Sequence, residues 1–297
     1  MQAVHCDWSV SPDKRVMAQA RRVDGCWRVS PPEPVDDPAT LIDRLSGRGP
    51  VLLGLDLPIG LPLAYARVAE ITDFRTALPR FAPAWFDVCD TPEEISPDRP
   101  FYPRRPGGAR RAQLLNGLGM IDPQDLLRRC ERATSTRSAA CSLFWTLGGN
   151  QVGKAAISAW GEVLRPAVGR IALWPFDGDL PDLLSRDGLT VAETYPADVY
   201  GRLGLPRRGW SKRAQAGRQA VAQPIVDWLE RHALPDAELA ALVRDGFGTG
   251  ASGEDAFDAL VGLIGMLDVI DGRMPDHAPA DPRIRQIEGW ILGQSPT

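Results

Sequence analysis

The 297-residue sequence has little lysine, histidine and cysteine, and it has no long uninterrupted hydrophobic run. Its three histidines form neither an H-x-x-H nor an H-E-x-x-H pattern, which argues against a zinc site of that kind. Its five cysteines show no C-x-x-C spacing, so they indicate neither a disulfide framework nor a cysteine zinc site, and they fit a reducing cytoplasm. The N-terminus lacks an apolar signal-peptide core, and Asp258 and Asp268 interrupt the most apolar late stretch, residues 256–270. We therefore expect a soluble, cytoplasmic protein with no membrane partner.

The order of hydrophobic patterns predicts an α/β fold with an insertion. Short apolar runs between residues 2 and 29, with turns near residues 11–13 and 24–25, predict three antiparallel strands. Residues 38–46 have helical spacing, and residues 50–56 resemble a buried strand. Further strands are predicted at residues 171–174, 190–194 and 288–292. We expect residues 1–71 and 169–297 to form a mixed sheet flanked by helices, and residues 72–168 to form an inserted, mainly helical lobe.

Three predicted strands each carry an acidic residue near one end. Asp7 lies in the first strand, where alternation places it on the face of His5. Asp56 ends the apolar run of residues 51–55, and Glu193 ends the strand before Tyr195. In open α/β sheets, ligands bind at the carboxyl edge of the strands. These acids are therefore candidates for one site, whereas His5 is interpreted as a core histidine.

A late helix, predicted at residues 252–267, adds two further acids. Asp255 and Asp258 are three residues apart and share one helical face, which Gly262 and Gly265 continue, so that the helix can approach a sheet closely. A capping box with Ser252 is an alternative explanation for Asp255. It does not explain Asp258, because an unpaired carboxylate among apolar neighbours is costly without a metal or a basic partner.

Six short motifs occur in a consistent order: CDW at residues 6–8, GLDLPIGLP at 54–62, ETYP at 193–196, WSK at 210–212, DAFDAL at 255–260 and EGWI at 288–291. Together they resemble the RNase H-like fold, and more closely a bacterial family of unknown function that is classed as predicted RNase H-like nucleases. The resemblance implies that Asp7, Asp56 and Asp258, with Asp255 beside it, are the site acids. It also implies that Glu193 and Lys212 belong to the site. Residues 72–168 exceed what a minimal RNase H core accommodates.

These acids suit metal-dependent phosphodiester hydrolysis. Two divalent ions can activate water and neutralise the attacking and leaving oxygens. Mg²⁺ or Mn²⁺ takes oxygen ligands, which a carboxylate cluster supplies without histidine or cysteine. We therefore expect one or two such ions at Asp7, Asp56, Asp255, Asp258 and Glu193, with Lys154 or Lys212 neutralising phosphate.

A second motif, residues 148–154, matches the phosphate-binding pattern G-x-x-x-x-G-K. It has Ala155 where the pattern needs the serine or threonine that binds Mg²⁺. A strand at residues 143–147 and a helix from residue 152 would give it the required strand, loop and helix. The alternative is that Asn150 caps the helix and the glycines only allow the turn. Lys154 in the first turn opposes the helix dipole, so it is a candidate for an anion contact.

Basic residues are concentrated in two segments, although the formal net charge of −4 excludes a polycation that coats nucleic acid. The first segment contains Arg104, Arg105, Arg110 and Arg111, with Phe101 and Tyr102 nearby. The second contains Arg207 and Arg208 beside Lys212. Arginines beside aromatic residues suit phosphate contact and base stacking, and a solvated loop is the alternative.

The sequence thus predicts a metal-dependent nuclease that acts on DNA or RNA. A non-catalytic nucleic-acid or protein binding module with the same fold is the main alternative, and a nucleotide-dependent phosphotransferase is the third. The sequence leaves the oligomeric state and the choice of substrate open.

Overall fold

The structure, a computed structural model, describes residues 1–47, 49–104, 109–134, 138–148, 151–250 and 252–296. The chain divides into two units, Met1–Asp56 with Pro181–Asp276 and Leu57–Leu180 with His277–Thr297. Its architecture is mixed α/β, as predicted. No helix formed by the described residues combines the length and the apolar character needed to cross a membrane.

The first unit contains a mixed sheet in which the strands run in the order β3-β2-β1-β5-β7, with β4 paired to β2. The pairs β1–β2 and β2–β3 are antiparallel, whereas β1–β5 and β5–β7 are parallel. The predicted change from antiparallel to parallel strands is therefore confirmed. The strands are β1 (Gln2–Asp7), β2 (Val16–Val23), β3 (Cys26–Val29), β4 (Glu33–Pro34), β5 (Pro50–Leu55) and β7 (Gly188–Glu193).

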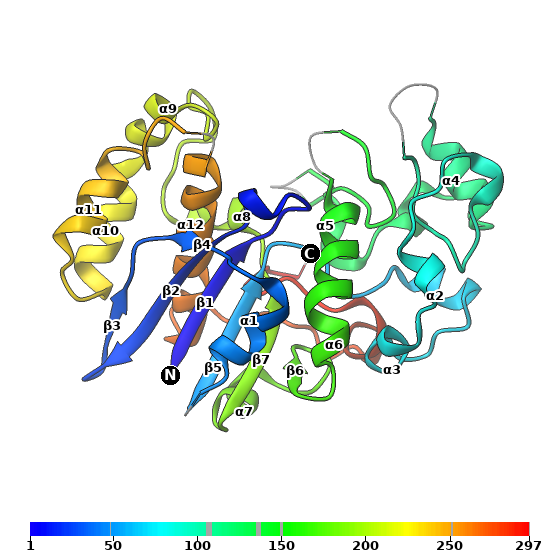
Figure 1. Cartoon of the computed structure of the whole chain (residues 1–297), viewed down its shortest axis with the longest axis horizontal. Helices are drawn as coiled ribbons and strands as arrows, with labels where there is room; N and C mark the ends of the chain where they lie inside the picture. The colour runs from blue at the N-terminus through cyan, green and yellow to red at the C-terminus, as the bar shows by residue number, and fades with distance from the viewer. Residues whose placement is uncertain (48, 105–108, 135–137, 149–150, 251, 297) are drawn as a thin grey trace. The chain divides into compact units, whose positions relative to one another are not determined.

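Helices flank this sheet, and Figure 1 shows α1 in front of the strands and α12 behind them. The α1 helix begins after Asp37, whose side chain accepts a hydrogen bond from the N–H of Ala39, and it buries Leu41, Ile42 and Leu45. The α12 helix is buried along most of its length, which explains its apolar composition. The helices are α1 (Pro38–Leu45), α7 (Leu180–Leu184, at the boundary of the unit), α8 (Pro196–Arg202), α9 (Gln215–Ala220), α10 (Ala222–His232), α11 (Ala237–Arg244) and α12 (Ser252–Ile270).

The second unit is mainly helices and loops around an aromatic core. The rings of Trp85 and Trp160 stack with their centroids 5.5 Å apart, and Phe101 and Phe144 pack edge to face at 5.4 Å. The principal elements are α2 (Leu63–Val68), α3 (Phe74–Ala77), α4 (Arg111–Gly117), α5 (Val152–Ala159), α6 (Arg165–Ala167) and β6 (Ile171–Leu173).

The units divide the chain at other positions than the sequence predicts, because the segment after Asp56 packs against the C-terminal segment. The N–H of Leu61 donates to the carbonyl of Ile287 at 2.9 Å. The buried Arg128 Nη1 donates to the carbonyl oxygens of Ile59 and Glu288 at 3.2 and 3.1 Å. The strand predicted at residues 288–292 was wrong: the chain is helical over Ile284–Glu288, and the apolar residues that follow are buried by packing.

Candidate active site

Parallel pairing brings the acids of β1 and β5 together at one edge of the sheet. Cys6 pairs with Leu55, so the next residues, Asp7 and Asp56, are neighbours. The N–H of Asp56 also donates to the carbonyl of Cys6 at 3.2 Å, which continues the ladder by one residue. Because β1 and β5 run in the same direction, both carboxylates lie at the carboxyl edge, where open α/β sheets bind ligands.

The two carboxylates lie on the sheet face that packs against α12. Two residues before Asp7, the fully buried His5 lies on the same face, and a Cβ added at Gly262 of α12 would stand 2.2 Å from its ring. This close approach confirms the predicted role of Gly262. Gly265 faces Val199 of α8 instead of the sheet. His5 is a core residue, and burial lowers its pKa to about 3.

The acid of β7 lies at the same edge but on the other face. Glu193 pairs with Leu55, so Thr194, and not Glu193, occupies the position beside Asp56 on the α12 face. Glu193 is buried. The Thr194 hydroxyl is buried and has no hydrogen-bond partner among the residues that the structure describes. Thr194 was not predicted from the sequence, because only the strand register shows which of two consecutive residues faces the helix.

The first two turns of α12 complete the cluster with Glu254, Asp255 and Asp258. The Asp258 side chain is only 5% exposed and accepts hydrogen bonds from the Tyr200 hydroxyl and the Lys212 ammonium. Lys212 Nζ also lies 3.4 Å from Glu254 Oε1. Asp258 and Lys212 were predicted from the sequence as site residues, whereas Glu254 and Tyr200 were not. The signal for Glu254 was its spacing, one helical turn before Asp258.

The carboxylates raise one another's pKa. Burial raises the pKa of Asp7 well above its ordinary value, and the charges of Asp56 and Asp258 raise it further. Burial and then the charge of Asp258 raise the pKa of Asp56 to about 8. The pKa of Asp258 is also raised by burial, although Lys212 opposes the rise. For Lys212, burial lowers the pKa, but the charge of Asp258 and the hydrogen bond to it raise it more, so the ammonium is stabilised.

A buried arginine fixes the segment that carries Lys212. Arg218 of α9 donates from Nε to the carbonyl of Gly246 at 2.7 Å and from Nη2 to that of Gly248 at 2.8 Å. Its Nη1 donates to the backbone carbonyl of Lys212 itself. The guanidinium thereby ties the Lys212 segment to the loop that precedes α12.

Of the other predicted phosphate-binding residues, two belong to the same unit as this cluster. Arg207 and Arg208 are exposed in the segment between Tyr200 and Lys212. Lys154, Arg104, Arg110 and Arg111 belong to the second unit, and Arg105 lies outside the described residues.

The described residues of the segment 148–154 are not preceded by the strand that a nucleotide-binding loop needs. The strand predicted at residues 143–147 was wrong, because only an isolated bridge joins Trp145 to Tyr102. The predicted helix does form, as α5. A Cβ at Gly153 would stand 2.3 Å from the carbonyl oxygen of Leu143, so the absence of a side chain here permits close packing. Asn150, the predicted cap, lies outside the described residues.

The donor set suits a hard divalent cation in its chemistry. Asp7, Asp56 and Asp258 offer carboxylate oxygens, and the unpartnered Thr194 hydroxyl lies beside them. As the side chains stand, however, no group of three or more histidine, cysteine, aspartate or glutamate residues in the described ranges has an arrangement that could hold a metal ion. The Lys212 ammonium lies against Asp258 Oδ2.

Comparisons with known proteins add no assignment. No family model matches the chain, and neither the curated proteins nor the solved structures contain a match.

Proposed function

We propose that this protein is an RNase H-like, metal-dependent phosphodiester hydrolase that acts on nucleic acid. One observation supports the proposal above all: carboxylates from β1, β5 and α12 meet on one face at the carboxyl edge of the parallel strands. Burial and mutual repulsion raise their pKa values, an electrostatic cost that folding alone does not require.

Asp7, Asp56 and Asp258 would hold the Mg²⁺ or Mn²⁺, and Asp255 lies next to them on α12. Such an ion, when bound, activates water and stabilises negative charge on phosphate oxygens. Glu193 lies on the other sheet face, so its effect on Asp56 is electrostatic.

The chain's own basic and aromatic groups would position the substrate. Lys212 carries a stabilised positive charge and is 38% exposed, so it can neutralise a phosphate while it remains close to Asp258. Arg207 and Arg208 precede it and are exposed. Trp210 is partly exposed, and its ring packs 5.5 Å from that of Tyr200, which suits a stacking surface for a base.

The proposal is tested by incubating the full chain with Mg²⁺ or Mn²⁺ and single-stranded, duplex or branched oligonucleotides. Asp7→Asn and Asp258→Asn should each abolish cleavage while circular dichroism shows a folded protein, because each removes a charged ligand. Asp187→Asn, at an exposed position outside the cluster, is the matched control and should cleave normally. Full activity in both cluster variants would refute the proposal.

The ion pair between Lys212 and Asp258 favours the second candidate, a non-catalytic binding module, because the ammonium neutralises this carboxylate without a metal. In that case oligonucleotide affinity would be the same in EDTA and in Mn²⁺, and no cleavage would accompany binding. The hydrolase predicts cleavage that EDTA stops.

A further inference from the structure

A pocket of about 600 Å³ lies in the first unit, away from the carboxylate cluster. Residues of α8 and α10, the end of α12 and the segment that follows α12 line it. This volume is in the range of small-molecule sites. Its basic lining residues are Arg202, Arg231, Arg273 and His232, and its acidic ones are Asp227 and Asp268.

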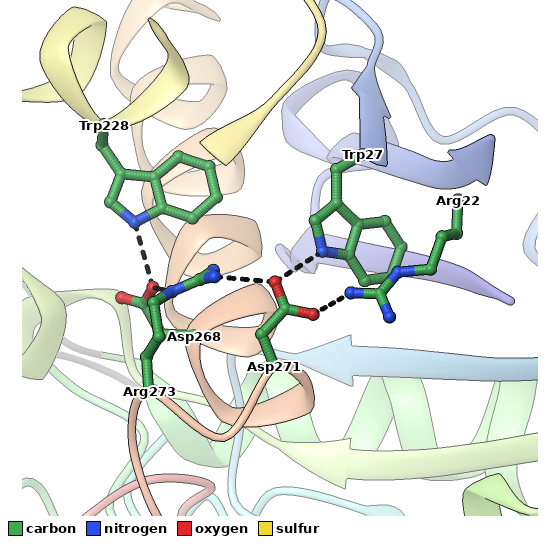
Figure 2. Close-up of polar contacts among 6 residues, drawn as sticks. All are labelled: Arg22, Trp27, Trp228, Asp268, Asp271 and Arg273. Carbon is green, nitrogen blue, oxygen red and sulfur yellow. Dashed lines mark hydrogen bonds and ion pairs between the residues drawn. The ribbon is translucent and has the colours of Figure 1, made fainter. Parts of the chain in front are cut away.

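Protein donors already engage both lining carboxylates. Asp268 Oδ1 accepts a hydrogen bond from Trp228 Nε1 at 3.0 Å and another from Arg273 Nε at 2.7 Å, as Figure 2 shows. Asp227 Oδ1 accepts one from the Gln223 side chain at 2.6 Å. Each lining carboxylate therefore already accepts at least one hydrogen bond from a protein side chain.

A rigid network supports the wall on which Arg273 lies. Arg273 Nη1 donates to Asp271 Oδ2 at 2.7 Å, and Trp27 Nε1 of β3 donates to the same oxygen at 2.9 Å (Figure 2). The guanidinium also lies over the Trp228 ring, 5.4 Å from its centroid. Because the side chains of Asp268, Asp271 and Trp228 hold Arg273, its charge stays at the pocket without a large loss of conformational freedom on binding a ligand.

Arg231 provides the positive charge that is still available. Its Nε donates to the carbonyl of Asp227 at 2.8 Å, which orients the side chain along α10. Its terminal nitrogens have no partner within the described part of the chain, and the residue is exposed. His232 is the next residue after Arg231. Its pKa is lowered by burial and then by the charge of the Arg273 guanidinium, which acts on the imidazole electrostatically.

We propose that this pocket binds a phosphate group, with Arg231 as its main contact and Arg202, Arg273 and His232 around it. A guanidinium with free terminal N–H groups donates two parallel hydrogen bonds to phosphate oxygens. The phosphate could belong to a small phosphate compound or to the backbone of a nucleic acid.

The second source has a structural rationale. Asp258 of the carboxylate cluster and Asp268 of the pocket are ten residues apart on α12, which is about 15 Å along a helix axis. The α8 helix likewise carries Tyr200, which contacts Asp258, and Arg202, which lines the pocket. The inference does not depend on the proposed hydrolase, because the pocket shares no lining residue with the carboxylate cluster.

Calorimetric titration of the full chain with inorganic pyrophosphate tests the site. We expect saturable binding that Arg231→Gln weakens about tenfold, the loss of one charge-assisted contact. Arg186→Gln, at an exposed position outside the pocket, is the matched control and should bind as the wild type does. Absence of saturable binding, or equal affinity in Arg231→Gln and the wild type, overturns the proposal.

A second measurement needs no variant. The protein has three histidines, so their ring signals can be followed by NMR during a pyrophosphate titration at constant pH. The chemical shift of His232 should change during the titration with the same dissociation constant that calorimetry gives, while that of His277 should not change. An unchanged His232 signal contradicts the proposal. A short single-stranded oligonucleotide then identifies the source. Displacement of pyrophosphate by the oligonucleotide supports a backbone phosphate, and binding of pyrophosphate without displacement supports a small phosphate compound.

Discussion

The raised pKa of Asp56 predicts how stability depends on pH. The carboxyl titrates near 3.8 in an unfolded chain and at about 8 in the folded protein. The folded state therefore holds its proton more tightly, and the free energy of unfolding should fall as the pH rises from about 4 to about 8. Asparagine mimics the protonated carboxyl, so Asp56→Asn should remove this part of the pH dependence.

The size of the effect follows from the pKa values. A rise of the Asp56 pKa from 3.8 to about 8 lowers the free energy of unfolding by at most about 6 kcal/mol between pH 4 and pH 8. Asp7, Asp56 and Asp258 share their protons, and Lys212 and solvent relieve part of the repulsion, so we expect about 2 kcal/mol. Asp56→Asn should thus gain about 2 kcal/mol relative to the wild type at pH 8 and much less at pH 5.

Urea unfolding followed by circular dichroism at pH 5 and pH 8, with EDTA present, measures this difference. EDTA is needed because a bound cation would stabilise the ionised carboxylates. Asp187→Asn controls for the loss of a charge outside the cluster and should show no such pH-dependent gain. If Asp56→Asn gains no more stability at pH 8 than at pH 5, the electrostatic description of the cluster is wrong.

Three further predictions concern packing and charge. Gly262→Ala should destabilise the protein by about 2 kcal/mol, because the added Cβ would overlap the buried His5 ring. Gly201→Ala in α8 is the control: its Cβ meets open space, so the substitution should be neutral or stabilising. Equal unfolding free energies for the two variants would contradict this prediction. Arg218→Lys should lower the free energy of unfolding, measured in urea, by about 2 kcal/mol, since one ammonium cannot reach all three carbonyls to which the guanidinium donates. Unchanged stability would mean that those hydrogen bonds contribute little. Lys212→Gln should raise the affinity for Mn²⁺ in calorimetry, because it removes the ammonium that competes with the metal for Asp258. It should also lower the rate of cleavage, because it removes the charge that neutralises phosphate. A lower Mn²⁺ affinity in the variant would contradict the proposed competition.

The sequence predicted the first unit well because its signals are local. The alternation in residues 2–29, the apolar run before Asp56 and the spacing of α12 each depend on neighbours a few residues away. These signals placed Asp7 and Asp56 near strand ends and Asp258 on a helix, and the family resemblance grouped the three acids into one site.

What the sequence missed depends on long-range pairing. The face on which Glu193 lies is set by its register with β5, and a slip of one residue would have exchanged it with Thr194. Within the second unit, Arg128 joins Ile59 to Glu288, which are far apart in the sequence, and this contact has no local sequence signature. Residues 288–292 have the composition of a strand, but they form only an isolated bridge at Ile291, and their apolar side chains are buried by packing.

The most direct test of the central claim is a calorimetric titration of the wild type, Asp258→Asn and Asp187→Asn with Mn²⁺, with and without a single-stranded oligonucleotide. The carboxylate cluster predicts saturable binding in the wild type and in Asp187→Asn, and loss of binding in Asp258→Asn, where a charged ligand is gone. Absence of Mn²⁺ binding to all three proteins, even with the oligonucleotide present, would contradict a metal-dependent hydrolase and would favour the binding module.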